Sequence, residues 1–256
     1  MSVPPVPSLL GVFAHPDDES LSAGGVLARH AAAGARTGVV TATWAPGTPR
    51  AAELADALGL LGAGEPRLLG YADARVPQSA PDAVRLLDAP LDESVRRLVA
   101  HLRAFRPDVV VTHDAYGGLP GHPDHVHTHR LTVLAVQAAG LERLYPDAGE
   151  PWQPRALYCA THPHSAVAGL RDVIGDVKTL YSVPDAQVTA AVDVLPWLDR
   201  KIAAVLAHRS EVERGAVPGV VAGLPGESRR RLFGTEWFIR HPTAGPVGRT
   251  QSELTV

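Results

Sequence analysis

Hydrophobic residues in this chain form short apolar runs, which alternate with longer segments where they recur every three or four positions. The first unit, residues 9–27, predicts a strand, a loop and a helix, and further runs predict buried strands at 37–43, 67–71, 108–112 and 156–161. Helical spacing occurs at 50–61, 91–105 and 123–139, and again near 195–213. Strands separated by such helices favour a Rossmann-like, doubly wound α/β fold, with a mostly parallel sheet and helices on both faces.

Chain length favours a single domain over residues 1–256. A chain of 256 residues that is 45% hydrophobic can bury a complete core. The alternating pattern is clear over a core of about 8–170 and weaker over 171–256, where the helix near 195–213 is followed by a short apolar segment at 235–239. We therefore expect one α/β domain with a small C-terminal extension.

Composition narrows the classes of function. No run of about eighteen apolar residues suggests a membrane span, and the N-terminal MSVPPVPS lacks the basic and apolar regions of a signal peptide, so a cytoplasmic location is expected. The formal net charge of −3 gives no electrostatic case for nucleic acid. Cys159 is the only cysteine, which excludes an internal disulfide and a multi-cysteine zinc site. A metal would have to be held by histidine and carboxylate side chains. The composition leaves open whether the chain forms a homo-oligomer.

The first chemical motif, His15-Pro16-Asp17-Asp18-Glu19, follows the first predicted strand. Pro16 suits the first position of a helix, and the three acids would then fill the first turn. Acids there complement the helix dipole, an effect worth up to about 1 kcal/mol. The dipole does not account for a histidine at the carboxyl end of a strand, which is where open α/β sheets bind their ligands.

A second cluster, from Gly121 to His129, repeats this plan after another predicted strand. His125 and His129 are four residues apart on the predicted helix, a spacing used for zinc, although four histidines in eight residues can also form a plain surface cluster. Two His-Pro-Asp turns at strand ends of one sheet favour the metal site. Together they can supply two histidines and a carboxylate, leaving an open coordination position.

These paired motifs resemble the LmbE-like (PIG-L) family of zinc-dependent N-deacetylases. The resemblance rests on Ala14-His15-Pro16-Asp17-Asp18-Glu19 together with Gly121-His122-Pro123-Asp124-His125. It extends to Arg50-x-x-Glu53, to Leu69-Gly70-Tyr71-Ala72-Asp73 and to His208-Arg209-Ser210-Glu211. The family includes the deacetylases and amidases of mycothiol metabolism, and it hydrolyses N-acetyl groups on glucosamine-containing substrates.

The resemblance implies a role for each matching residue. It places one Zn²⁺ per chain, with Fe²⁺ as an alternative ion, on three ligands: His15, Asp18 and His125. His129 is not a ligand in that pattern, which corrects the expectation from spacing.

Two further roles are implied for the reaction itself. Asp17 is expected as the general base, and a protonated His122, oriented by Asp124, is expected to stabilise the oxyanion and protonate the leaving amine. Arg50 and Asp73 are expected to hold sugar hydroxyls, although Arg50 can instead pair with Glu53 across a helical turn.

The expected function is a zinc-dependent hydrolase that removes an N-acetyl or related N-acyl group from a small molecule containing an amino sugar. Alternatives are an amidase of the mycothiol S-conjugate type, an N-deacetylase of secondary metabolism, and a non-catalytic binding protein stabilised by metal. Loss of the base would indicate the last, but Asp17 and His122 are both present. The sequence assigns no role to five other histidines: His113, His129, His162, His164 and His208.

Overall fold

A seven-stranded sheet forms the centre of the protein, in a computed structural model that describes residues 6–174, 180–241 and 243. The strand order is β3-β2-β1-β4-β5-β7-β6. The first five strands are parallel, whereas β7 runs antiparallel to both β5 and β6. The strands are β1 (Leu9–Phe13), β2 (Thr37–Thr43), β3 (Arg67–Tyr71), β4 (Val109–His113), β5 (Ala156–Thr161), β6 (Ala190–Asp193) and β7 (Thr235–His241).

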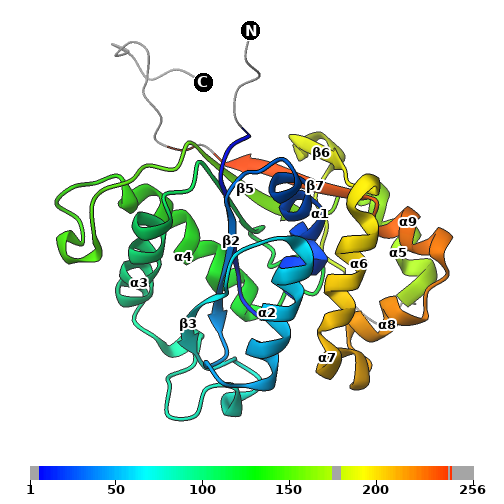
Figure 1. The fold of residues 1–256 in the computed structure, drawn as a ribbon, viewed down its shortest axis with the longest axis horizontal. Coiled ribbons are helices and arrows are strands. Elements are labelled where there is room, and N and C mark those ends of the chain that lie inside the picture. Colours follow the sequence, from blue (N-terminus) through cyan, green and yellow to red (C-terminus); the bar gives the residue numbers. More distant parts are fainter. Residues whose placement is uncertain (1–5, 175–179, 242, 244–256) are drawn as a thin grey trace, which may run out of the picture.

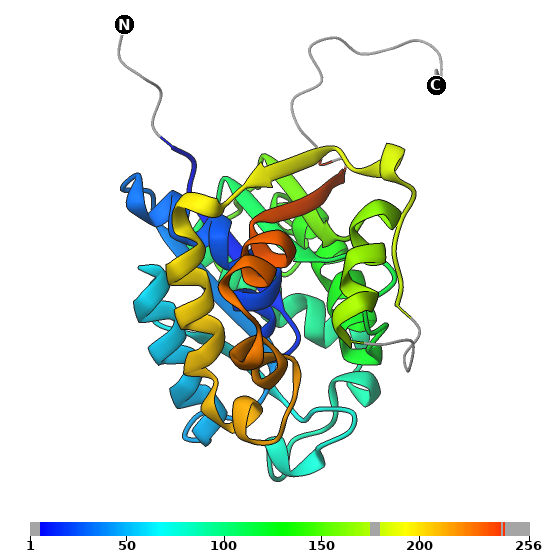
Figure 2. The same cartoon turned by 90° about the vertical axis from the view of Figure 1, so that its right-hand side faces the viewer.

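Helices cover both faces of the sheet (Figure 1). One face packs against α3 (Leu91–Phe105) and α4 (Pro123–Ala139), and the other against α1 (Asp18–Ala32), α2 (Pro49–Leu61) and α6 (Leu198–Ala207). The remaining helices are α5 (His164–Ile174), α7 (Arg209–Glu213), α8 (Val217–Gly223) and α9 (Gly226–Phe233). Figure 2 looks onto the side where α6, α8 and α9 lie. The predicted doubly wound α/β class is confirmed.

The two hydrophobic cores follow from the alternation of side chains along each buried strand. In β1, Leu10 and Val12 join the core beneath α3 and α4, whereas Leu9 and Phe13 join the core beneath α1, α2 and α6. Because both faces are covered, β1 is apolar along its whole length, which is why its sequence shows a continuous run. Within the described ranges, no helix is long and apolar enough to cross a bilayer.

The strand order fixes where a ligand site can form. From β1 the chain builds outward in one direction through β2 and β3, and from β4 it builds in the other direction through β5. The neighbouring strands β1 and β4 therefore flank the point where the order reverses, and crevices at such points bind ligands in open α/β sheets. Both His-Pro-Asp turns start from the carboxyl ends of these two strands.

Two helix predictions differ from the structure. The helix expected near 195–213 is interrupted at His208, whose backbone is non-helical with φ −77° and ψ 66°, so α6 and α7 are separate. The first helix begins at Asp18 rather than at Pro16, because Asp17 has φ 123° and cannot continue a helix from the proline. Pro123, in contrast, does occupy the first turn of α4, as such a proline should.

Residues 190–193 and 235–241, from the expected C-terminal extension 171–256, add two strands to the central sheet. Of that extension, residues 175–179, 242 and 244–256 lie outside the described residues, as do residues 1–5 of the N-terminal segment. Glu236 in β7 reaches into α1, where its carboxylate accepts the N–H groups of Gly25 at 2.7 Å and Val26 at 2.9 Å. Lys201 of α6 pairs with the same carboxylate at 2.8 Å.

We expect Gly25→Ala to destabilise the protein by about 1 to 3 kcal/mol, since overpacking a core has this cost. A Cβ atom on Gly25 would clash with the Cβ atom of Val194, so one backbone must move. Gly59→Ala is the matched control, because Gly59 lies in α2 with nothing within 4 Å of an added Cβ. The control should be neutral or stabilising in thermal unfolding. Equal melting temperatures for the two variants would contradict the prediction.

Candidate active site

The three side chains predicted as metal ligands lie together at the carboxyl ends of β1 and β4. Nδ1 of His15 is 3.0 Å from Nε2 of His125 and 3.3 Å from Oδ2 of Asp18, and Nε2 of His125 is 3.2 Å from Oδ1 of Asp18. All three residues are buried. Ligands about 2.1 Å from a tetrahedral metal lie about 3.4 Å from one another. The spacing of these atoms therefore matches what one metal ion requires.

Hydrogen bonds at the far side of the His15 ring fix which nitrogen faces the other ligands. Nε2 of His15 lies 3.1 Å from the carboxylates of both Asp73 and Asp124. Ionised carboxylates only accept hydrogen bonds, so Nε2 carries the proton and Nδ1 is directed to Asp18 and His125. Burial alone would lower the pKa of His15, but Asp124, Asp18 and Asp73 raise it well above its usual value. The carboxylates around His15 thus favour a positive charge at Nδ1, which either a proton or a metal cation can supply.

His125 is oriented in the same manner by the backbone. Its Nδ1 donates to the carbonyl of Gly117 at 3.1 Å, which leaves an unprotonated Nε2 facing Asp18 and His15. Lone pairs of nitrogen and carboxylate oxygen directed at one another repel unless a cation lies between them. Outer hydrogen bonds that fix histidine tautomers in this way accompany most metal-binding histidines. The donor set and its tautomers therefore fit a divalent metal.

Asp17 stands beside this cluster in an unusual backbone conformation. Its φ of 123° is rare for a residue with a side chain, and such values cost on the order of 1 to 3 kcal/mol. Its Oδ1 lies 3.1 Å from Nη2 of Arg50. Burial raises the pKa of the Asp17 carboxyl to about 7, with Arg50 opposing that rise. A carboxylate with a raised pKa is a stronger base than an exposed one.

His122 is the N-cap of α4, and its Nδ1 accepts the backbone N–H of Asp124 at 3.2 Å. In the neutral ring the proton is therefore on Nε2, which makes that atom a hydrogen-bond donor. Burial, followed by the effect of His15, lowers the pKa of His122 to about 4, so the ring is neutral near pH 7. The structure thus differs from the expectation of a protonated His122.

Asp124 is expected to orient His122, and Asp73 is expected to hold a sugar hydroxyl. In this structure both carboxylates instead accept from His15. Oδ2 of Asp124 is 3.9 Å from Nδ1 of His122, beyond hydrogen-bond distance, and it accepts the N–H of Ala74 at 2.9 Å. The Oδ1 atom of Asp73 accepts the N–H of Arg75 at 2.6 Å. Burial would raise the pKa of Asp73, but the hydrogen bond from His15 holds it below its usual value.

Arg50 does not pair with Glu53 across a helical turn. Its guanidinium instead lies between Asp17 and Glu211, with Nη1 at 3.2 Å from Oε1 of Glu211, and it also donates to the carbonyl of Pro16. Glu53 accepts from Ser210. Arg50 is only 6% exposed, so its guanidinium contacts the proposed base rather than standing open to a substrate.

His113, to which the sequence assigns no role, lies in the cluster. Its ring stacks on His125 at 4.0 Å, and Asp18, His113 and His125 are close enough to share an ion. Its Nε2, however, accepts the N–H of Ala14 at 3.1 Å. Burial, together with the nearby His125, lowers the pKa of His113 to about 4. Its position at the end of β4 is the signal that could have placed it here.

The other unassigned histidines lie outside the ligand set. His129 donates to the carbonyl of His113 at 2.9 Å, which agrees with its exclusion as a ligand. His164 contacts Ser182, and His162 packs near Trp237. His208 pairs with Glu19 and is considered further below.

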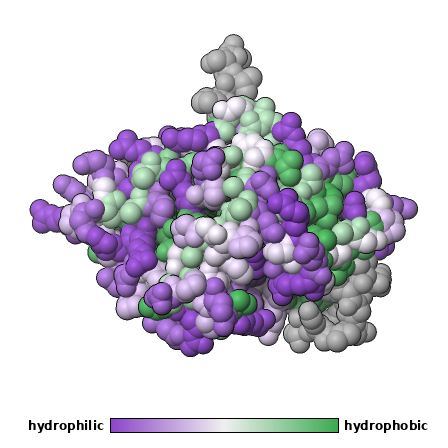
Figure 3. Space-filling view, turned by 60° about the horizontal axis from the view of Figure 1, so that its bottom comes forward, coloured by the Kyte–Doolittle hydropathy of each residue, from purple (hydrophilic) through white to green (hydrophobic). Residues whose placement is uncertain are grey.

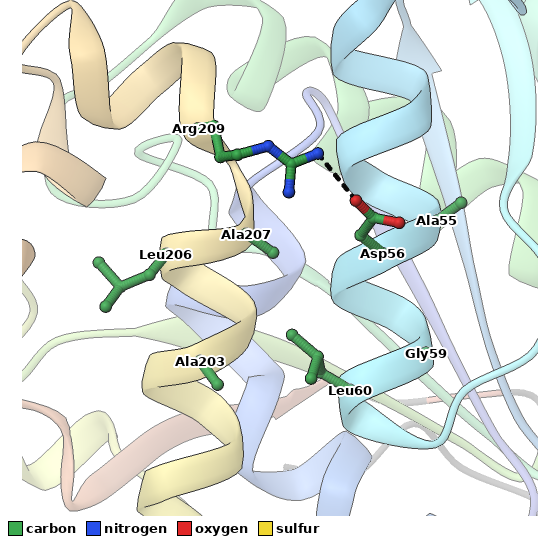
Figure 4. Close-up of a pocket in the computed structure, with 8 residues that line it drawn as sticks. All are labelled: Ala55, Asp56, Gly59, Leu60, Ala203, Leu206, Ala207 and Arg209. Atoms are coloured by element: carbon green, nitrogen blue, oxygen red, sulfur yellow. Dashed lines mark hydrogen bonds and ion pairs between the residues drawn. The ribbon is translucent and has the colours of Figure 1, made fainter.

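A surface groove of about 640 Å³ lies away from the cluster, between α2 and α6 (Figure 4). It is lined mainly by small and apolar residues, and an ion pair of 2.9 Å joins Asp56 and Arg209 across it. None of the cluster residues lines this groove. Figure 3 shows another view of the surface, on which hydrophilic and hydrophobic residues are interspersed.

Comparison with known sequences agrees with the motifs. A profile described as "PIG-L: GlcNAc-PI de-N-acetylase" matches residues 10–136. The 1D-myo-inositol 2-acetamido-2-deoxy-alpha-D-glucopyranoside deacetylases of Rhodococcus jostii (strain RHA1) and Rhodococcus opacus (strain B4) are 39% and 41% identical over 266 residues. Each alignment covers 90% of this chain and 90% of the relative.

Solved structures share the fold. The conserved protein TT1542 from Thermus thermophilus is 29% identical, with a TM-score of 0.63 over 97% of this chain and 100% of that one. The N,N'-diacetylchitobiose deacetylase of Pyrococcus horikoshii is 19% identical, with a TM-score of 0.62 over 92% and 84% of the two chains. Because the profile spans both His-Pro-Asp motifs and the curated relatives align over most of both chains, this chain belongs to the PIG-L family of de-N-acetylases.

Proposed function

We propose that this protein is a zinc-dependent N-deacetylase that acts on N-acetylglucosamine joined to inositol. One observation carries the reaction type: the carboxylate of Asp18 and one ring nitrogen each of His15 and His125 lie 3.0 to 3.3 Å from one another, with the tautomers of both histidines fixed from outside. The curated relatives, which carry the name of a deacetylase for an inositol glycoside of N-acetylglucosamine, support the substrate. The ion is proposed as Zn²⁺ because two histidines and one carboxylate suit it, and Fe²⁺ is the alternative.

A metal on these ligands would supply Lewis acidity, which polarises an acyl carbonyl and lowers the pKa of water. Asp17 is the proposed base, since it adjoins the ligand Asp18 and its carboxylate is buried beside Arg50. It accepts a proton as water adds to the amide carbon. The same proton can then pass to the departing nitrogen, which leaves as an amine while acetate is formed.

His122 is proposed to stabilise the negative charge that develops on the carbonyl oxygen. Its Nδ1 is occupied by the N–H of Asp124, so Nε2–H is the donor that remains. The ring lies edge-on to His15 with centroids 4.7 Å apart, which places it beside the ligand cluster. Removal of one such donor typically lowers kcat by about 100-fold to 1,000-fold. A neutral ring is sufficient for this role.

The function is tested by measuring amine release from three amides by the zinc-loaded protein. We expect release from N-acetylglucosaminyl-inositol, less from free N-acetylglucosamine, and none from a mycothiol S-conjugate. A chelator should abolish the activity, and added Zn²⁺ should restore it. Preference for the conjugate would support the amidase instead. No release from any N-acetyl amino sugar by the fully metal-loaded protein would overturn the proposal.

Asp73→Asn should separate two roles for that carboxylate. As a partner of His15, Asp73 should support metal binding, because loss of such an outer hydrogen bond typically weakens metal affinity by about 10-fold to 100-fold. KM measured at saturating metal should then change little. Asp88→Asn, at an exposed residue that pairs with Arg85, is the control. A raised KM with unaltered metal affinity would assign Asp73 to the sugar instead.

A further inference from the structure

The 208–211 turn, which comprises His208 and the first three residues of α7, is linked to the proposed base Asp17 through two other residues, Glu19 and Arg50. Within it, His208 is completely buried, and its Nε2 lies 2.9 Å from Oε1 of Glu19, which is also completely buried. Nδ1 of His208 is buried without a hydrogen-bond partner, so its polar contact is with Glu19. These two residues are 189 positions apart in the chain. A contact of this kind links the C-terminal part directly to the first motif.

Glu19 passes this contact on to the backbone of Asp17. Its second oxygen, Oε2, accepts the N–H of Asp17 at 3.0 Å, while Oε1 also accepts from Ser20 at 2.5 Å. The N–H of Asp17 has to be held in place because φ at this residue is 123°. Residues keep such conformations only where their surroundings fix them. The Glu19 carboxylate, held by His208, is one part of those surroundings.

The same turn reaches the side chain of Asp17 by a second route. Glu211 pairs with Nη1 of Arg50 at 3.2 Å, and Nη2 of that guanidinium lies 3.1 Å from Oδ1 of Asp17. Arg50 and Glu211 are both buried. The backbone of Asp17 is therefore held through Glu19, and its carboxylate is held through Arg50. Both of these residues contact the 208–211 turn.

The turn is itself fixed to α2. The N–H and hydroxyl of Ser210 donate to Glu53 at 2.9 Å and 2.7 Å. On the outer surface, Arg209 pairs with Asp56 across the groove of Figure 4. A turn anchored in this way is a rigid support, from which His208 reaches Glu19 and Glu211, three residues later, reaches Arg50.

We propose that His208 is a positioning residue for catalysis, which acts through Glu19 to hold the backbone of Asp17, and that Glu211 acts in parallel through Arg50. The proposal rests on the proposed function, since it concerns the residue assigned as base. It predicts that changes at His208 alter turnover rather than metal binding or substrate affinity. Outer contacts of this type typically affect activity by about 10-fold to 100-fold.

The first test compares His208→Leu with His208→Gln and with a control, Arg103→Met. Leu removes the donor to Glu19, and kcat should fall by about 10-fold to 100-fold with KM and zinc content unchanged. Gln keeps an N–H donor and should recover most of the loss. Arg103→Met removes another set of buried hydrogen bonds, from α3 to the carbonyls of Ala139 and Gly149. Asp17 is not among the partners of Arg103, so this variant should have a lower melting temperature and an unchanged kcat.

The second test is a double-mutant cycle with Asp17→Asn. If His208 acts through Asp17, adding His208→Leu to Asp17→Asn should lower kcat by less than about two-fold, because the effects of coupled residues are not additive. If His208→Leu does not fold, Glu211→Gln takes its place in the cycle, with the same expectation.

Three results would overturn the proposal: full kcat in His208→Leu, zinc loss in proportion to lost activity, or additive losses in the cycle. Failure of the proposed function looks different, because the wild-type protein would then release no amine. Zinc content and melting temperature, measured on every variant, do not depend on activity and show whether the fold and the ligands are intact.

Discussion

Alanine at His15, Asp18 or His125 is expected to remove stoichiometric metal together with all turnover. Three protein ligands leave no redundancy in a site of this kind, and each substitution deletes one of three polar groups that lie 3.0 to 3.3 Å apart. The measurement is elemental analysis of the purified variants after dialysis against zinc. It gives an answer that is independent of the substrate.

The matched control for this prediction is His129→Ala. His129 lies one helical turn beyond His125 on α4, but it donates to the carbonyl of His113 and is not directed at the ligands. This variant should retain full zinc. Full zinc in Asp18→Ala, or its loss in His129→Ala, would contradict the ligand assignment.

Asp17→Asn is expected to keep the metal and lose on the order of 100-fold to 10,000-fold in kcat, which is the usual contribution of a general base. Asparagine preserves the shape and can still accept from Arg50, but it cannot take a proton from water. It also tolerates positive φ better than most residues, so the backbone at 123° should persist. KM should change little, because the carboxylate that is replaced is expected to act on water and not on the bound substrate.

Single-turnover assays with zinc analysis on the same sample would check this second prediction. A variant that keeps wild-type turnover would remove Asp17 from the proposed mechanism. One that loses metal in parallel with activity would instead make it a further ligand. Comparison with Asp18→Asn, the adjacent carboxylate, should separate the two roles: only the change at 18 should reduce zinc binding.

The fold can be predicted well from the sequence where burial determines the pattern. Residues 37–43, 67–71 and 156–161 are predicted as strands and form β2, β3 and β5 with the same bounds, since apolar and β-branched residues dominate each run. The position of the helix break at His208 could not be predicted. It accompanies a contact with Glu19, 189 residues away, and no local signal records such a pairing.

The candidate site shows the same division. His15 and His125 could be brought together from the sequence because both follow strands of one parallel sheet, whose carboxyl ends share an edge. The partners of Asp73, Asp124 and Arg50 could not be predicted. Several buried groups of suitable charge surround each of these side chains, and differences of a few tenths of an ångström decide which group it contacts. Spacing along the chain does not contain those distances.

The contact between Glu236 and α1 has a consequence for how the protein folds during synthesis on the ribosome. In the helix that carries Asp18 and Glu19, the N–H groups of Gly25 and Val26 donate to Glu236, which lies 211 and 210 positions later in the chain. Domains emerge N-terminal end first, and contacts of long sequence separation form late. A nascent chain that has exposed both His-Pro-Asp motifs, but not yet β7, therefore has an incompletely supported first helix. Catalytic competence should appear only after β7 has left the ribosome and Glu236 has reached α1.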